Sequence, residues 1–227
     1  MKLLSLFDGS GGFPLAAAMC GIEPILASEI EPYPIAVTRS RFPNMKHLGD
    51  VSRINGAEIE PCDIISFGSP CQDLSVAGLR NGIQGERSGL FMEAIRIIKE
   101  MRDATANEFP RWAIWENVPG AFSSGKPKGE DFRIVLEEFV KICEPDATMP
   151  AADEGGWAYA DIIMGEGWSI AYRVLDAQLW VPQRRKRIYL VASFRDQRAG
   201  EILFERESLR GYSPTGEQAW QETTADA

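Results

Sequence analysis

Short apolar runs alternate with longer helical stretches along the chain, and this alternation constrains the fold more than any other feature. A repeated strand–helix–strand order is typical of α/β proteins, in which helices cover a mostly parallel sheet. We therefore expect an α/β fold. The predicted strands are residues 2–7, 24–29, 62–68, 111–116, 169–176 and 187–193. The predicted helices are residues 14–20, 33–42, 88–103 and 130–143.

Two of these helices carry an apolar stripe at the i, i+3, i+4 spacing of a helix that packs on a sheet. The stripe of helix 88–103 consists of Leu90, Phe91, Ala94, Ile95, Ile98 and Met101. The stripe of helix 130–143 consists of Phe132, Val135, Leu136, Phe139, Val140 and Cys143. The connection between the last two strands is too short for a helical crossover, so we expect these strands to pair antiparallel.

The cysteines and the single histidine exclude several kinds of site. Cys20, Cys62, Cys71 and Cys143 lie far apart without a C-x-x-C pair, so neither a disulfide framework nor a metal site is expected. A chain of 227 residues can bury a sizeable core without such links. We expect Cys20, Cys62 and Cys143 to lie in the core, whereas Cys71 lies in a loop after a predicted strand.

The net charge of −9 disfavours nucleic acid as a partner, because affinity for nucleic acid depends largely on phosphate neutralisation. Residues 144–166 contain six acidic residues and no lysine or arginine, and segment 144–168 resembles an inserted excursion. From residue 194 the sequence is polar, and we expect neither strand nor helix there. The basic cluster Arg184–Arg187 keeps nucleic acid open, although such a cluster alone fits a solvated turn. No apolar run approaches the roughly 20 residues that span a bilayer, and the chain starts without a signal peptide, so a cytoplasmic location is expected.

A glycine-rich turn follows the first predicted strand. Residues 7–12 read Phe-Asp-Gly-Ser-Gly-Gly, which differs from the G-x-G-x-x-G of a pyrophosphate cradle. Glu29 ends the second strand about twenty residues later, where an acid can accept hydrogen bonds from ribose hydroxyls. Asp50 could accept from an adenine amino group. Each feature alone fits an ordinary turn or strand end, but together they indicate a nucleoside cofactor without a pyrophosphate.

Three further segments suggest a catalytic pair with arginines beside it. Cys71 lies in Gly-Ser-Pro-Cys-Gln, directly after a strand, where a thiolate is accessible. Glu116 ends another strand at the same edge, so a thiolate could attack an electron-poor ring carbon while an acid protonates a ring nitrogen. Arg185 and Arg187 alternate in an extended segment and can face the same pocket, where guanidinium groups would lower a cysteine pKa.

Six stretches in this order resemble the cytosine-C5 DNA methyltransferase family in its phage and prophage form. They are LFDGSGG, SEIEPY, GDV, GSPCQDLS, WENV and QRRKR, and they span residues 4–193. The resemblance implies a Rossmann-like fold that uses S-adenosyl-L-methionine, with a seven-stranded sheet and an antiparallel final strand. It also implies a double-stranded DNA substrate whose cytosine is flipped out, because the ring faces are not reachable within a duplex. In prokaryotes and phages this activity belongs to restriction-modification.

The resemblance also assigns roles to residues. Cys71 would add to cytosine C6, Glu116 would hold or protonate N3, and Arg185 and Arg187 would contact the base and the catalytic loop. The positions that match the cofactor pocket are Phe7, Asp8, Gly9, Gly11, Gly12, Glu29, Ile30, Asp50, Val51 and Pro70. The positions that match DNA contacts are Gln72, Ser75 and Arg184.

This sequence departs from the family pattern in three places. Ile30 stands where an aromatic residue is frequent, and Ser69 where phenylalanine is common. The family continues with a target-recognition domain and a late motif, for which residues 194–227 are too short. We therefore expect a catalytic and cofactor-binding domain at residues 1–193 and an irregular remnant at 194–227. The chain would then be a truncated product, a fragment, or one half of a split enzyme in which a second polypeptide supplies the recognition domain.

Two other functions stay open at this point. One is cytosine-C5 methylation of tRNA, which the same fold supports. The other is a catalytically inactive chain that acts only by binding, as a truncated product would. The intact Cys71, Glu116 and Arg185 argue against the inactive chain.

Overall fold

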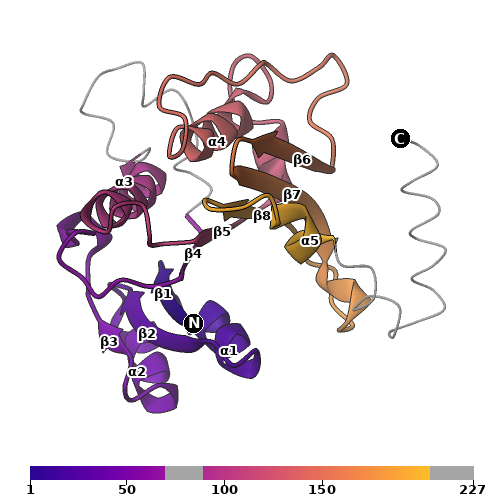
Figure 1. Ribbon diagram of the computed structural model, residues 1–227. Coiled ribbons are helices and arrows are strands. Elements are labelled where there is room, and N and C mark those ends of the chain that lie inside the picture. The colour runs from indigo at the N-terminus through magenta and orange to yellow at the C-terminus, as the bar shows by residue number, and fades with distance from the viewer. Residues whose placement is uncertain (70–88, 205–227) are drawn as a thin grey trace.

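The computed structural model describes residues 1–69 and 89–204, which form an eight-stranded sheet with helices on both faces (Figure 1). The strands are β1 (Lys2–Leu6), β2 (Glu23–Ser28), β3 (Lys46–His47), β4 (Ile64–Phe67), β5 (Trp112–Asn117), β6 (Ala160–Gly165), β7 (Trp168–Asp176) and β8 (Lys186–Ser193). The α-helices are α1 (Gly12–Met19), α2 (Pro32–Arg41), α3 (Gly89–Ala104), α4 (Glu130–Val140) and α5 (Ala199–Leu203). Three 3₁₀ turns are η1 (Val51–Arg53), η4 (Pro119–Phe122) and η5 (Ala177–Leu179).

The strand order is β3-β2-β1-β4-β5-β8-β7-β6. Strands β1 to β5 pair in parallel, whereas β8 is antiparallel to both β5 and β7. The predicted α/β class and the antiparallel pairing of the last two predicted strands are therefore confirmed. The sheet has eight strands and not the seven that the resemblance implies. Part of the acidic segment 144–168, expected as an excursion, forms the edge strand β6, which pairs with β7.

Helices α3 and α4 cover one face of the sheet, and α1 and α5 lie on the other (Figure 1). Both predicted apolar stripes are confirmed, except that Leu90 and Cys143 are only half-buried. At the centre of the main core, the Phe132 ring lies among four aromatic rings. Its centroid is 4.6 Å from that of Phe122, 4.9 Å from Tyr172, 5.4 Å from Trp157 and 6.1 Å from Trp115.

The position of β1 determines where a ligand can bind. β1 lies between β2 and β4. After β1 the chain adds β2 and β3 on one side of it, and then crosses over to add β4 and β5 on the other side. In open α/β sheets this reversal creates a crevice at the carboxyl ends of the two neighbouring strands. The loops after β1 and β4, which carry the predicted site residues, begin at this crevice.

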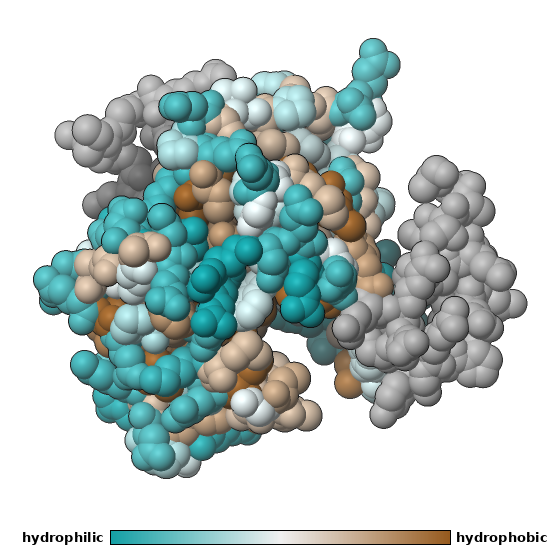
Figure 2. Space-filling model, in the orientation of Figure 1, coloured by the Kyte–Doolittle hydropathy of each residue, from teal (hydrophilic) through white to brown (hydrophobic). Residues whose placement is uncertain are grey.

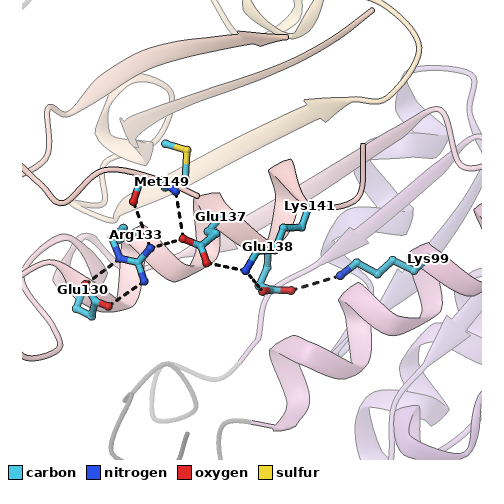
Figure 3. A network of polar contacts seen from close by, with 7 residues as sticks. All are labelled: Lys99, Glu130, Arg133, Glu137, Glu138, Lys141 and Met149. Carbon is cyan, nitrogen blue, oxygen red and sulfur yellow. Dashed lines mark hydrogen bonds and ion pairs between the residues drawn. The ribbon is translucent and has the colours of Figure 1, made fainter. Parts of the chain in front are cut away.

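A network of charged side chains fixes the segment that follows α4 (Figure 3). The Glu137 carboxylate accepts hydrogen bonds from Lys141 Nζ at 2.6 Å, from the Met149 amide at 3.1 Å, and from Arg133. Burial raises the pKa of Glu137, but these hydrogen bonds outweigh that effect and lower the pKa to about 2. The ionised carboxylate thus ties residue 149 back onto the helix.

Two sequence expectations are wrong. Cys20 is exposed and not in the core, because α1 ends at Met19 and the next residue faces solvent. Cys62 is fully buried, as expected, and burial raises the pKa of its thiol to about 12.

The five-residue helix α5 lies where neither strand nor helix was expected. Its first amide, that of Ala199, donates to Ser169 Oγ at 3.0 Å.

Apolar side chains gather over α1 on a face that is otherwise largely hydrophilic (Figure 2). Leu15 and Met19 are both exposed there. None of the helices within the described ranges is long and apolar enough to cross a membrane.

Candidate active site

The loop after β1 turns sharply into α1. Phe7, Gly9 and Gly11 all have positive φ, at 52°, 55° and 85°. A residue with a side chain is strained at positive φ, which makes the non-glycine Phe7 a backbone outlier at the carboxyl end of β1. A Cβ at Gly11 would lie 2.8 Å from Thr38 Cγ2, so glycine also lets α2 approach the loop.

Glu29 holds this loop against the end of β2. Its Oε2 accepts from the Gly9 amide at 2.8 Å, and its Oε1 accepts from the amides of Ile30 at 2.7 Å and Glu31 at 3.0 Å. The structure therefore brings Glu29 and the glycine-rich turn together, although they are twenty residues apart. Three amide donors fix the carboxylate at the place where a ribose was predicted.

Asp50 has a structural role in the described chain. Its Oδ1 caps η1 by accepting from the Ser52 amide at 2.9 Å and from Ser52 Oγ at 2.8 Å, which lowers the pKa of Asp50. The next residue, Val51, is buried. Asp50 is thus held in a fixed, solvent-exposed position, and its role as the cap of η1 is sufficient to explain that position.

Asp8 is the buried acid of the glycine-rich turn. It is 7% exposed, and its Oδ1 accepts from Ser5 Oγ at 2.7 Å. Its Oδ2 is buried and has no hydrogen-bond partner within the described residues. Burial raises the pKa of Asp8 to about 6. An unpaired buried acceptor is costly, and at a ligand crevice it indicates a place for a donor group of the ligand.

The substitution Asp8→Asn is expected to stabilise the ligand-free protein at pH 8. Because the pKa is raised on folding, the folded chain binds more protons between about pH 4 and 6, and the wild type loses stability as pH rises through that window. A neutral amide avoids this loss, a gain on the order of 1–3 kcal/mol. Urea denaturation at pH 4 and pH 8 measures it: the variant should gain at pH 8 and little at pH 4. An equal effect at both pH values would contradict a buried, titrating Asp8.

At the carboxyl end of β5, an ion pair positions the predicted catalytic acid. Arg187 Nε lies 2.9 Å from Glu116 Oε1, and the two side chains are 21% and 24% exposed. The end of β4 approaches the same carboxylate, since a Cβ at Gly68 would lie 3.1 Å from Glu116 Oε2. Glycine at residue 68 thus leaves room beside the acid.

Two side chains of β5 hold the last described residue before Pro70. Asn117 Nδ2 donates to the Ser69 carbonyl at 3.3 Å, and Trp115 Nε1 donates to Ser69 Oγ at 3.4 Å. All three residues are buried. Trp115 and Asn117 flank Glu116 in sequence, which is the only signal that could have found them. The predicted residues Pro70, Cys71, Gln72 and Ser75 lie outside the described residues.

Arg185 and Arg187 line one cavity of about 180 Å³, and Glu116 is not among its lining residues. The other lining residues are Leu175, Ala177, Trp180 and Tyr189. Arg184 is exposed, and its Nε donates to Gln178 Oε1 at 3.2 Å. Trp180 and Tyr189 carry no functional signal in the sequence, because neither belongs to the basic cluster.

A mostly parallel sheet with a glycine-rich turn after β1, an acid–guanidinium pair at the end of β5 and an antiparallel β8 is a Rossmann-like α/β fold of the methyltransferase class. A DNA modification methyltransferase encoded within a prophage of E. coli has a similar fold, with a TM-score of 0.57 and 24% identity over 85% of this chain and 46% of the other. The family model for C-5 cytosine-specific DNA methylases matches residues 1–142, and the chain belongs to that family.

Curated relatives extend the similarity. The chain is 31% identical to the Type II methyltransferase M2.BsuMI of Bacillus subtilis, over 91% of this chain and 45% of the relative. It is 32% identical to a protein of Escherichia phage P1 named DNA N-6-adenine-methyltransferase, over 91% of this chain and 30% of that protein. The chain thus spans 30% to 45% of the length of these relatives.

Proposed function

We propose that this chain transfers a methyl group from S-adenosyl-L-methionine to C5 of a flipped-out cytosine in double-stranded DNA. The observation that carries the proposal is the Arg187–Glu116 pair, which lies beside the Gly68–Ser69 segment that leads to Cys71. A carboxylate held in place next to the strand end that carries the thiol suits attack on a ring carbon with a proton at the ring nitrogen.

In the proposed reaction the Cys71 thiolate bonds to C6 while Glu116 holds a proton at N3, which makes C5 nucleophilic. The cofactor supplies the methyl group that C5 accepts. Loss of the C5 proton then restores the C5–C6 double bond and expels the Cys71 thiolate. Arg187 keeps the Glu116 carboxylate oriented towards the ring. Arg185, two residues earlier, is proposed to bind the base or the loop that carries Cys71.

The crevice residues suit the proposed cofactor. The unpaired Asp8 Oδ2 fits the cationic amino group of the methionyl part, and Glu29 fits the ribose hydroxyls. The residues proposed to hold the cofactor are Phe7, Asp8, Gly9, Gly11, Gly12, Glu29, Ile30, Asp50, Val51 and Pro70. Gln72, Ser75 and Arg184 are proposed to contact the DNA.

Sequence-specific recognition is proposed to come from outside these 227 residues, on a longer form of this protein or on a second polypeptide. The relatives contain long regions without a counterpart in these 227 residues, and the chain itself has a net charge of −9. Few phosphate contacts are therefore available from the chain alone. Slow, weakly selective transfer by the isolated chain fits this proposal.

Nucleoside analysis of the product tests the proposed function. The purified chain is incubated with isotope-labelled cofactor and, separately, with unmethylated genomic DNA and with tRNA, and the digests are examined by mass spectrometry. Labelled 5-methylcytosine in DNA, absent from a Cys71→Ala control, is expected. Labelled N6-methyladenine as the only DNA product would overturn the proposal, and 5-methylcytosine in tRNA alone would transfer it to the tRNA alternative.

A further inference from the structure

The cavity behind Arg187 adjoins the surroundings of Glu116, because its lining residue Tyr189 lies opposite Glu116 in the pairing of β5 with β8. Its lining comes from the end of β7, from the connection to β8, and from the first residues of β8. Glu116 is not among the lining residues, although Arg187 both lines the cavity and pairs with Glu116. One arginine therefore borders the proposed cytosine site and this second space.

An exposed tryptophan forms one wall of the cavity. Trp180 is 48% exposed, and the apolar Val181 beside it is exposed as well. Isolated exposed apolar residues need no explanation, but an indole ring that borders a cavity offers a flat surface to a planar ligand. The β7–β8 connection that carries Trp180 extends away from the sheet beyond α5 (Figure 1, orange).

Hydrogen bonds hold the connection in one shape without a ligand. Asp176 Oδ1 accepts from the Gln178 amide at 3.1 Å and from the Arg185 amide at 2.9 Å, and the Ala177 amide donates to the Arg185 carbonyl at 3.2 Å. The Trp180 amide donates to the Ala177 carbonyl at 2.9 Å. The loop is thus closed at its base, so the indole and the Arg185 guanidinium are presented together at low entropic cost.

The charge around the cavity selects an anionic partner. Arg185 and Arg187 line the cavity, and Arg184 and Lys186 are exposed next to them in the sequence, in a chain whose net charge is −9. An aromatic ring beside guanidinium groups is the usual platform for unpaired nucleobases, which stack on the ring while the cations neutralise the phosphates.

We propose that Trp180, which lines the cavity together with Arg185 and Arg187, forms a second nucleobase subsite that stacks a base of the DNA substrate other than the target cytosine. The inference rests on the proposed function for its substrate. Arg187 borders both the Trp180 cavity and the surroundings of Glu116. A base stacked on Trp180 would therefore hold the DNA next to the target cytosine while that cytosine lies at Glu116. Stacking is tolerant of sequence, so this subsite adds affinity for an unpaired strand without choosing a recognition site.

Binding measurements without cofactor test the subsite. The probe is a fluorescently labelled single-stranded oligodeoxynucleotide of about 20 nucleotides, longer than the site size of one binding domain. Anisotropy titrations of the full 227-residue chain over a range of salt concentrations give the Kd and its salt dependence. Stacking changes the affinity at every salt concentration, whereas a lost phosphate contact changes the slope of log Kd against log salt.

The Trp180→Ala variant is expected to bind roughly 5- to 150-fold more weakly with an unchanged salt slope, and Trp180→Phe to keep most of the affinity. Arg184→Ala should reduce the slope by about 0.7. Tyr159→Ala is the matched control, since Tyr159 is an exposed aromatic in the acidic segment, and it should bind like the wild type. Wild-type affinity in Trp180→Ala, a changed slope in that variant, or no binding by the wild type at low salt would overturn the subsite.

The outcome is separable from the proposed function. No methyl transfer occurs in this assay, so a chain that binds through Trp180 but yields no 5-methylcytosine keeps the subsite and loses the enzymatic proposal. A chain that methylates DNA but binds without Trp180 loses only the subsite.

Discussion

Replacing Glu116 by glutamine is expected to slow covalent trapping by DNA that contains 5-fluorocytosine roughly 10²–10⁴-fold, the usual contribution of a general acid. Fluorine at C5 cannot leave as a proton does, so the step that frees Cys71 stops and the enzyme stays bonded to the DNA. Glutamine keeps the size of the side chain and can still accept a hydrogen bond from Arg187 Nε, but it cannot deliver a proton to N3. The measurement is the rate at which a denaturation-resistant adduct forms in the presence of cofactor.

Two further variants make this measurement specific. Cys71→Ser should form no adduct, and an adduct that persists in it would assign the nucleophile to another residue. Glu130→Gln changes a glutamate whose Oε2 also lies 2.9 Å from an arginine Nε, that of Arg133, with a similarly low exposure. This control should trap at the wild-type rate. A Glu116→Gln rate within a few-fold of the wild type would remove Glu116 from the chemistry.

The sheet and its helices could be predicted from the sequence wherever burial of one face places apolar residues at a regular spacing. Helices α3 and α4 each pack a continuous apolar stripe against the sheet, and the strands beneath them consist of runs of buried apolar residues. Strand β6 lacks that signal because it lies at the sheet edge with Ile162 and Met164 exposed. Helix α5 has five residues, of which only Ala199 is buried, so it is too short to show a period.

The site was predictable where two residues follow consecutive strands about twenty residues apart, and not where side-chain contacts join residues more than forty apart. Glu29 could be placed beside the glycine-rich turn because both follow neighbouring parallel strands. The contacts of Trp115 and Asn117 with Ser69 span more than forty residues and depend on the pairing of β4 with β5. The unpaired Oδ2 of Asp8 could not be inferred from any pattern, because it depends on what the folded chain places around it.

Trp115 connects the core to the candidate site. Its ring is fully buried, with its centroid 6.1 Å from that of Phe132 and 6.3 Å from that of Phe91, while its Nε1 donates to Ser69 Oγ. The next residue along β5 is Glu116. The aromatic cluster therefore sets the position of the strand that carries the acid and of the residue that leads to Pro70. Loss of packing in this cluster should be felt in the stability of the whole domain.

The Phe132→Ala variant is expected to lower the free energy of unfolding by roughly 3–5 kcal/mol, the usual cost of removing a fully buried phenylalanine. For a chain of this length that corresponds to a Tm lower by about 6–20 °C. The cost is large because four aromatic neighbours, and not solvent, surround the ring, and they come from η4, from β5, from β7 and from the segment between α4 and β6. Urea denaturation and thermal melting followed by circular dichroism measure both quantities.

Two comparisons decide whether this cost comes from packing at the centre of the cluster. Phe132→Leu fills most of the space and should cost clearly less than the alanine variant. Tyr159→Ala removes another ring that contacts Phe122, with centroids 5.9 Å apart, but Tyr159 is 64% exposed and should cost about 1 kcal/mol or less. If Phe132→Ala lost no more stability than Tyr159→Ala, the cluster would not support β5, and the acid at residue 116 would have to be positioned by Arg187 and Gly68 alone.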